Sequence, residues 1–399
     1  MGILGIVVLL GLAFLLSNNK RNINWHTVGV GLALQVGIGF LLIKWEAGNQ
    51  GMQWFAGKAA SFLGLASHGT RFLFGNLVDP AMMGTFGFQF AFTVLPVIIF
   101  FSAFTSFLYY IGVLQKVVQG VAWVMSRLMR TSGAESLSCS GNIFLGQTES
   151  PLLIRPFLNH LTMSELCAVM VGGFGTIAGS VMAGYILMGI SAQHIIIAST
   201  MAAPASLMIA KIIFPETGHS ETAGGVKLPA IDRGRNVLDA ISRGTTDGLH
   251  LALNVAAMLV AFITLIACFD KILSWGDRWI DGAWLTGVLM KNGEYAGWFP
   301  GSLKTAFGTL LSPLALVMGV PAADVQNVGH LLGLKLSVNE FVAYSKLGPL
   351  MKEGLISEKG GIMATYILCG FANFASIGIQ IGGISALAPE RRSDLAKLG

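Results

Sequence analysis

The chain has 399 residues, of which 54% are hydrophobic and 11% are charged, and its formal net charge is +5. Soluble domains carry roughly a quarter charged residues, so this composition argues against a water-soluble globular protein. Its Lys and Arg residues are scattered in short polar connections and form no basic stripe, which argues against nucleic-acid binding.

Long apolar segments predict helices that cross a membrane, because one such helix needs about 20 apolar residues. The ten-residue alternation expected of membrane-spanning strands is missing. No small-residue cleavage pattern follows the first segment, and Lys20 and Arg21 come directly after it, so we expect a retained span. The seven predicted spans cover residues 3–16, 27–43, 90–114, 166–188, 194–214, 249–269 and 360–387.

Two further stretches, 136–160 and 325–351, are apolar at both ends and interrupted centrally by charged, Gly or Pro residues. Each is typical of a re-entrant hairpin. Basic residues of short loops favour the cytoplasm, which predicts that the hairpins enter the membrane from opposite sides. Thr162 and Glu165 fit a capping box that opens the helix after the first hairpin. Four tryptophans predict an interfacial belt: Trp275, Trp279, Trp284 and Trp298.

A polar linker from Pro215 to Thr246 divides the chain into halves that repeat weakly. Gly146 to Glu149 and the block from Gly173 to Thr176 are echoed in the second half by Asn339 with Glu340 and by the block from Gly370 to Asn373. Inverted repeats of this kind are typical of secondary transporters. The predicted fold is therefore an all-α integral membrane protein with inverted repeats and two re-entrant helical hairpins.

Glu149 lies in the sequence Gly-Gln-Thr-Glu-Ser-Pro, which cannot continue as one helix and leaves backbone groups free to meet a ligand. Its donors and acceptors suit a polar, uncharged solute. An ionisable group at membrane depth indicates function, because its insertion is costly without partners or water. The alternative is a structural turn in which Glu149 pairs with Arg155.

Glu340 in the second hairpin is the other candidate, since a carboxylate accepts hydrogen bonds from hydroxyl groups strongly. An ion pair with Lys335 or Lys346 is its structural alternative. In the last span Asn373 and Ser376 share one helix face, where they serve either a ligand or helix packing.

Asn142, one turn before the first polar sequence, and Thr176 in the following helix offer side-chain oxygens to a hard cation. Carbonyl groups freed at Leu145 and Ile177 complete the candidate set. The alternative for Thr176 is a hydrogen bond to its own helix.

Three ordered blocks give this chain a strong resemblance to the concentrative nucleoside transporter family, closest to its bacterial sodium-coupled members. They are Gly146 to Glu149, Val338 to Tyr344, and Cys369 to Asn373. The resemblance implies a homotrimer with partly unwound spans, in which a mobile transport domain slides like an elevator against a scaffold. It assigns residues 1–115 to scaffold spans, 116–214 to a first transport repeat, 215–248 to a cytoplasmic linker, 249–300 to a scaffold span with a periplasmic loop, and 301–399 to a second transport repeat.

The resemblance also implies roles for individual residues. The nucleobase would meet Gln147, Thr148 and Glu149. The ribose hydroxyls would meet Glu340, Asn373 and Ser376, while Val181 and Phe371 would give apolar contact. Sodium would bind Asn142, Leu145, Thr176 and Ile177; proton-coupled relatives tend to lack an Asn at the first of these positions.

These patterns predict a sodium-coupled nucleoside symporter of the bacterial inner membrane, with no cofactor besides the coupling ion. The alternatives are proton coupling, a static channel, or an intramembrane enzyme that uses Glu149 and Glu340. The last has no HExxH or nucleophile-elbow motif to support it. Two departures from the family are Ala375, where relatives often have Ser, and the end at Gly399, where the family continues into one more span, so we expect the final span to be absent.

Overall fold

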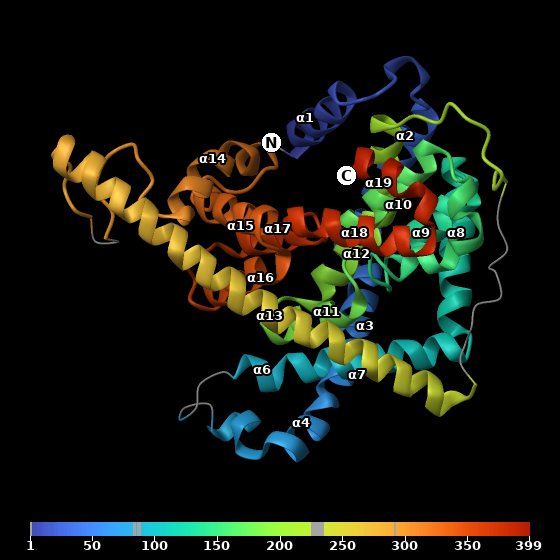
Figure 1. Cartoon of the computed structure of the whole chain (residues 1–399), viewed down its shortest axis with the longest axis horizontal. Helices are drawn as coiled ribbons and strands as arrows, with labels where there is room; N and C mark the ends of the chain where they lie inside the picture. The colour runs from blue at the N-terminus through green and yellow to red at the C-terminus, as the bar shows by residue number, and fades with distance from the viewer. Residues whose placement is uncertain (1, 83–84, 86–88, 225–234, 291–292) are drawn as a thin grey trace. The chain divides into compact units, whose positions relative to one another are not determined.

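The computed structural model describes residues 2–82, 85, 89–224, 235–290 and 293–399. Within these ranges the chain is helical and contains no strand, only one isolated bridge between Leu289 and Tyr295 (Figure 1). The predicted all-α class is therefore confirmed. Gly225, Lys227, Pro229 and Asp232 of the predicted linker lie outside the described residues.

Backbone contacts divide the chain into two units. One contains Met1–Leu9 and Asn254–Leu368, and the other contains Leu10–Leu253 and Cys369–Gly399. The predicted division into scaffold and transport segments stays a prediction. The α-helices of the second-named unit are α2 (Trp25–Gly39), α3 (Glu46–Gly64), α4 (Ala66–Phe74), α6 (Phe90–Thr93), α7 (Leu95–Tyr110), α8 (Val113–Met129), α9 (Gly133–Gly141), α10 (Met163–Gly175), α11 (Gly179–Leu187), α12 (Ala192–Ile213), α18 (Phe374–Leu387) and α19 (Arg392–Leu398).

Two helices extend through both units, α1 (Gly2–Leu15) and α13 (Val237–Asp277). The unit that contains Asn254–Leu368 holds α14 (Leu303–Val317), α15 (Val325–Ser337), α16 (Glu340–Lys352) and α17 (Glu358–Leu368). Short 3-10 or π segments complete the fold: η1 (Lys20–Asn22), η2 (Phe40–Lys44), η3 (Gly75–Val78), η4 (Pro80–Met82), η5 (Ser150–His160), η6 (Arg278–Trp284) and η7 (Pro389–Arg391).

Five helical segments of the described chain are long and apolar enough to cross a membrane, which makes this a multi-pass membrane protein. They are Trp25–Lys44, Phe90–Tyr110, Met163–Leu187, Ala192–Ile213 and Val237–Trp284. The other two predicted spans differ from expectation. The first is a shorter apolar helix of 14 residues, α1, and the last is divided into α17 and α18. The predicted spans also omitted α3, α8 and α14, whose mixed polar composition masks them in a search for apolar runs.

Both predicted hairpins are helix-turn-helix pairs, formed by α9 with η5 and by α15 with α16. Their re-entry into the membrane stays a prediction. The capping box at the start of α10 is confirmed: Thr162 Oγ1 accepts from the Glu165 amide at 3.1 Å, and Glu165 Oε2 accepts from the Thr162 amide at 2.8 Å. A second capping box, which the sequence analysis missed, joins Ser132 and Glu135 at the start of α9.

A buried charge cluster fixes the starts of α9 and α10 against α12. Lys211 Nζ lies 2.8 Å from Glu135 Oε2, 2.8 Å from Ser164 Oγ and 3.3 Å from Glu216 Oε2. Glu135 is 1% exposed, so its charge depends on the lysine for compensation. The cluster therefore holds the first hairpin in a defined position.

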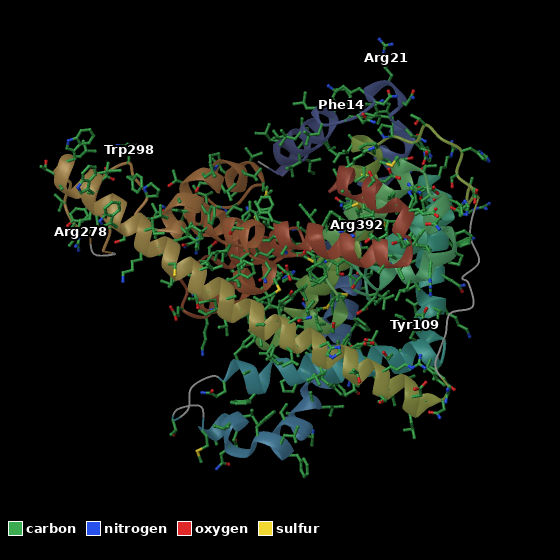
Figure 2. All side chains as sticks on the ribbon, viewed as in Figure 1. Phe14, Arg21, Tyr109, Arg278, Trp298 and Arg392 are labelled. Atoms are coloured by element: carbon green, nitrogen blue, oxygen red, sulfur yellow. The ribbon has the colours of Figure 1, made fainter. Side chains whose placement is uncertain are left out.

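The four predicted belt tryptophans, Trp275, Trp279, Trp284 and Trp298, are all exposed. Figure 2 shows Trp298 beside the segment that carries Arg278, the first residue of η6. Exposed indole rings at one end of a long apolar helix are typical of a membrane interface. Their position in a bilayer stays a prediction.

Candidate functional site

The first hairpin turns where the sequence stops supporting a helix. α9 ends at Gly141, η5 begins at Ser150, and Pro151 and Pro156 lie within η5. Ser150 Oγ donates to the Ser138 carbonyl across the hairpin at 2.5 Å, and the missing side chain of Gly141 lets Ser150 and Leu153 approach α9 closely. The residues between the two helices are thereby presented as a fixed turn.

Glu149 lies at the end of this turn, and its side chain is exposed. Glu149 Oε2 accepts a hydrogen bond from the Gly146 amide at 3.1 Å, which fixes the carboxylate over the turn. Within the described chain it forms no ion pair with Arg155, so the structural alternative for Glu149 gains no support. Thr148 beside it is also exposed.

Gln147 points to the other side of the turn, toward α18. Its Oε1 accepts from Gln380 Nε2 at 3.1 Å, and its Nε2 donates to Ser376 Oγ at 3.4 Å. Gln380 Nε2 also donates to the Met170 carbonyl of α10 at 3.1 Å. Gln380 therefore positions Gln147, a role that the sequence analysis missed. A signal was present, because Asn373, Ser376 and Gln380 recur at the spacing of one helix face.

The long fourth and last predicted spans are both interrupted, and their interruptions meet. The break between α10 and α11 covers residues 176–178, and the break between α17 and α18 covers 369–373. The Phe371 amide donates to the Thr176 carbonyl at 3.2 Å. A Cβ on Gly370, whose φ is +123°, would lie 2.6 Å from the Phe174 carbonyl oxygen, so only glycine allows this approach.

Beyond these breaks each continuing helix carries a predicted substrate residue near its start. Asn373 Oδ1 caps α18 by accepting from the Ser376 amide at 2.9 Å. Val181, on the first turn of α11, is 3% exposed, and Phe371 is half-buried. The structure thus brings Gln147, Ser376 and the two breaks together in one unit of the chain.

Asn142 has a side chain without a partner in a closed environment. It is 1% exposed, and neither Oδ1 nor Nδ2 forms a hydrogen bond with the described residues. Gly172 of α10 lies beside it, since a Cβ added there would be 3.3 Å from Asn142 Nδ2. Thr176 Oγ1 donates to the Gly172 carbonyl at 2.8 Å, which is the hydrogen bond to its own helix given above as the alternative for this residue. Asn142 and Thr176 therefore approach the same residue, and the cation role of Thr176 stays a prediction.

Leu145 and Ile177 lie in the two stretches where the helical backbone is interrupted, after α9 and after α10. Both are buried. A set of side-chain and backbone oxygens is a ligand set that suits a hard cation. The four predicted cation ligands are therefore all buried residues of one unit, and all four lie at or beside breaks in helical backbone.

Glu340 belongs to the other unit and begins α16. It is 4% exposed, and Asn339 caps its helix by accepting from the Val342 amide at 2.9 Å. Lys335, one of its possible partners, donates to the Ile367 carbonyl at 3.0 Å. The predicted grouping of Glu340 with Asn373 and Ser376 around a ribose stays a prediction.

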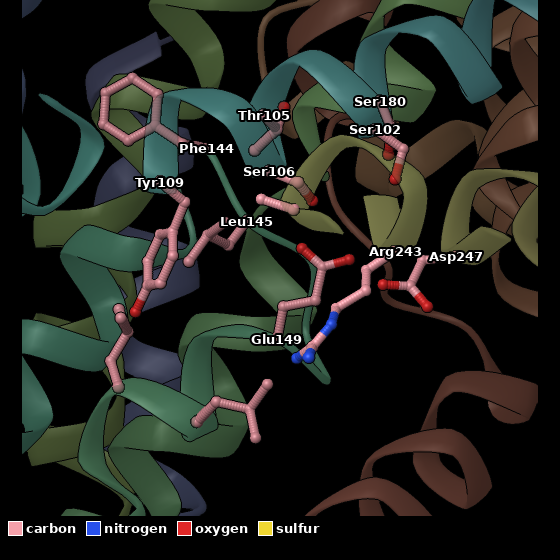
Figure 3. A pocket seen from close by; sticks show the side chains of 13 residues that line it. Ser102, Thr105, Ser106, Tyr109, Phe144, Leu145, Glu149, Ser180, Arg243 and Asp247 are labelled. Carbon is pink, nitrogen blue, oxygen red and sulfur yellow. The ribbon is translucent and has the colours of Figure 1, made fainter. Parts of the chain in front are cut away.

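A pocket of about 250 Å³ opens beside Glu149 (Figure 3). Phe144, Leu145 and Ser180 line it together with Glu149, and α7 and α13 supply the facing wall. The wall is polar and is formed by Ser102, Thr105, Ser106, Tyr109, Arg243 and Asp247. The site can therefore hold a small polar molecule next to the predicted base-contacting residue.

Comparison with known proteins gives the family of this chain. Three family models match it: the Na⁺ dependent nucleoside transporter N-terminus over residues 4–77, the nucleoside recognition Gate domain over 91–192, and the Na⁺ dependent nucleoside transporter C-terminus over 194–399. An uncharacterized transporter of Haemophilus influenzae is 43% identical, covering 100% of this chain and 92% of the relative.

The sodium/nucleoside cotransporter 2 of Rattus norvegicus is 40% identical over 99% of this chain, which spans 58% of that longer protein. The solved structure of CNTnw in an inward-facing substrate-bound state is 38% identical and superposes with a TM-score of 0.91, over 100% of this chain and 92% of CNTnw. Agreement of sequence and fold over the whole chain leaves one conclusion. The protein belongs to the concentrative nucleoside transporter family, whose members are nucleoside transporters of the membrane and not enzymes.

Proposed function

We propose that this protein is a sodium-coupled symporter that imports nucleosides such as uridine across the inner membrane of a bacterium. The observation that carries the choice of sodium is Asn142, a buried amide whose oxygen has no partner among the described residues. Its side chain lies beside Gly172, the residue whose carbonyl accepts from Thr176. Burying an unpaired amide is costly, and a cation bound to its oxygen would remove the part of that cost that comes from the oxygen. An amide does not exchange protons in the physiological range, which disfavours proton coupling through this site.

The nucleoside would bind where Gln147, Ser376 and the two helix breaks come together. Gln147 offers an amide that is already positioned by Gln380, while Thr148 and Glu149 extend the polar surface of the turn. Glu340 would add a carboxylate for the ribose hydroxyls, and Val181 and Phe371 would contact apolar faces. Such a mixture of few oriented polar groups and apolar walls suits a neutral, polar ligand.

We further propose an elevator-type mechanism in a homotrimer, as the resemblance to the family implies; the conformational states of a relative support the alternating access. CNTnw has been solved in inward-facing, outward-facing and intermediate states, and this chain superposes on them with TM-scores of 0.91, 0.90 and 0.90. In this proposal the first hairpin and the broken helices move as one body against a scaffold. The bacterial relatives of Haemophilus influenzae and Bacillus subtilis support an inner-membrane location.

Radiolabelled uridine uptake into proteoliposomes tests this proposal. A sodium gradient, a proton gradient or no gradient is imposed on vesicles that carry the wild type or Glu340→Gln. We expect accumulation with sodium alone, and loss of most uptake in the variant because a neutral acceptor binds hydroxyl groups more weakly. Glu353→Gln, at the exposed end of the same helix, is the matched control and should transport normally.

Accumulation that follows only the proton gradient would replace sodium by protons as the coupling ion. Equilibration without accumulation under either gradient would indicate a channel. If the uptake rate of Glu340→Gln equals that of Glu353→Gln, the assignment of Glu340 to the ribose hydroxyls is wrong, even where sodium coupling holds.

A further inference from the structure

The pocket beside Glu149 has a wall whose chemistry the proposed function does not use. α7 and α13 pack there through small residues: a Cβ on Gly244 would lie 2.4 Å from Ser106 Oγ, and a Cβ on Gly248 would lie 2.8 Å from Ser102 Cβ. Such small residues spaced four apart allow close helix contact in membranes. Arg243 and Asp247, each directly before one of these glycines, line the pocket as a result.

The charges around this pocket leave an excess of acceptors. Glu149 and Asp247 contribute two carboxylates, and Arg243 is the one cationic side chain in the described lining. Arg243 Nη2 is 3.0 Å from Asp239 Oδ2, a turn earlier on α13, so its charge is already compensated. No hydrogen bond or ion pair among the described residues ends on the Asp247 carboxylate. Figure 3 shows Glu149, Arg243 and Asp247 converging on the pocket.

We propose that Asp247 is a further substrate-contacting residue, which makes the transporter prefer nucleosides whose base carries an exocyclic amino group. The amino group of cytosine or adenine has two N–H donors, one for Glu149 and one for Asp247. The oxo group of uracil or hypoxanthine has only lone pairs, which the two carboxylates repel. Sites that hydrogen-bond an N–H group discriminate strongly against analogues without it, because the protein acceptors are then left unpaired. This inference rests on the proposed function.

The test compares kcat/KM for cytidine with that for uridine, and for adenosine with that for inosine, in sodium-driven proteoliposome uptake. We expect the wild type to prefer the amino member of each pair. In Asp247→Asn the ratio should fall about tenfold, the loss expected for one hydrogen bond to a charged acceptor. Asp247→Glu should keep the preference, since it keeps the carboxylate.

Asp239→Asn provides a second variant that does not touch the pocket directly. It frees Arg243 to compensate Asp247 and should also lower the preference for amino bases. Glu46→Gln, which removes an exposed carboxylate at the start of α3, should leave both ratios unchanged.

A wild type without preference, or an Asp247→Asn that lowers uptake of all four nucleosides equally, would overturn the inference. Unchanged ratios in both Asp247→Asn and Asp239→Asn would do so as well. Each of these results still requires nucleoside uptake by the wild type, so the proposed function survives them. Failure of the proposed function would instead appear as no uptake of any nucleoside.

Discussion

Gln380 shows how one buried side chain orders a proposed binding residue. It is fully buried in α18 and connects Gln147 of the first hairpin to the Met170 carbonyl of α10. Leaving a buried amide group without a hydrogen-bond partner costs about 1–3 kcal/mol of stability. The position of Gln147 therefore depends on the hydrogen bonds that Gln380 makes to it and to Met170. The nucleoside would therefore meet a glutamine whose orientation is fixed before binding.

Replacing Gln380 by methionine keeps the volume and removes the hydrogen bonds to Gln147 and Met170. We expect the KM for uridine to rise about tenfold, because about 1.4 kcal/mol of preorganisation is lost. Uptake kinetics measure this change. Ser385→Ala on the same helix, where the hydroxyl is exposed, is the control. An unaltered KM in Gln380→Met would show that Gln147 needs no such support.

At the scale of elements, the crossing of the two broken helices decides the geometry of the site. A break in a helix leaves backbone amides and carbonyls without hydrogen bonds inside that helix. Here the Phe371 amide and the Thr176 carbonyl hydrogen-bond to each other across the crossing. The Thr176 side chain bonds the Gly172 carbonyl, and Gly172 lies beside Asn142. Asn373 starts α18 with a cap. The predicted cation and nucleoside residues are thus coupled through shared backbone.

Gly370→Ala tests this crossing. The added methyl group would meet the Phe174 carbonyl oxygen at 2.6 Å at a φ of +123°, so the crossing must shift. Backbone strain of this kind costs about 1–3 kcal/mol, and we expect a lower melting temperature in detergent and loss of most uptake. Gly378→Ala on α18 has no atom within 4 Å of its new Cβ and should behave as the wild type. Equal behaviour of the two variants would contradict this role of the crossing.

For the whole molecule, symport requires that sodium and nucleoside favour the same conformation. The proposed cation residues Asn142 and Thr176 and the proposed nucleoside residues Gln147 and Ser376 belong to one unit. In it α10 lies against Asn142 at Gly172 and against Gln147 at Gly173. A cation that orders this unit would lower the cost of ordering it for the nucleoside. Such coupling is reciprocal, because both ligands act on one equilibrium.

We therefore expect the affinity for uridine to rise about 5- to 150-fold between sodium-free and saturating sodium conditions. Equilibrium binding to purified protein, with choline replacing sodium, measures this change. Asn142→Ala should bind uridine with the weaker affinity in both media. Thr200→Ala, which removes a hydroxyl that bonds only within α12, is the control. Equal affinity of the wild type with and without sodium would refute the coupling.

The sequence by itself determined that the protein belongs in a membrane, that it is helical and that it has two helical hairpins. The length of the apolar segments and their interruption by Gly or Pro are local features of the sequence, so no tertiary contact is needed to predict these properties. It also indicated Asn142, Gln147, Glu149, Thr176 and Asn373, whose polarity is conspicuous in apolar surroundings. Only the tertiary structure decided that the last predicted span is interrupted between α17 and α18, that Gln380 supports Gln147, and that Asp247 lines the same pocket as Glu149. These features arise where helices distant in sequence pack through glycines or share one hydrogen bond, and no local pattern records which helices will meet.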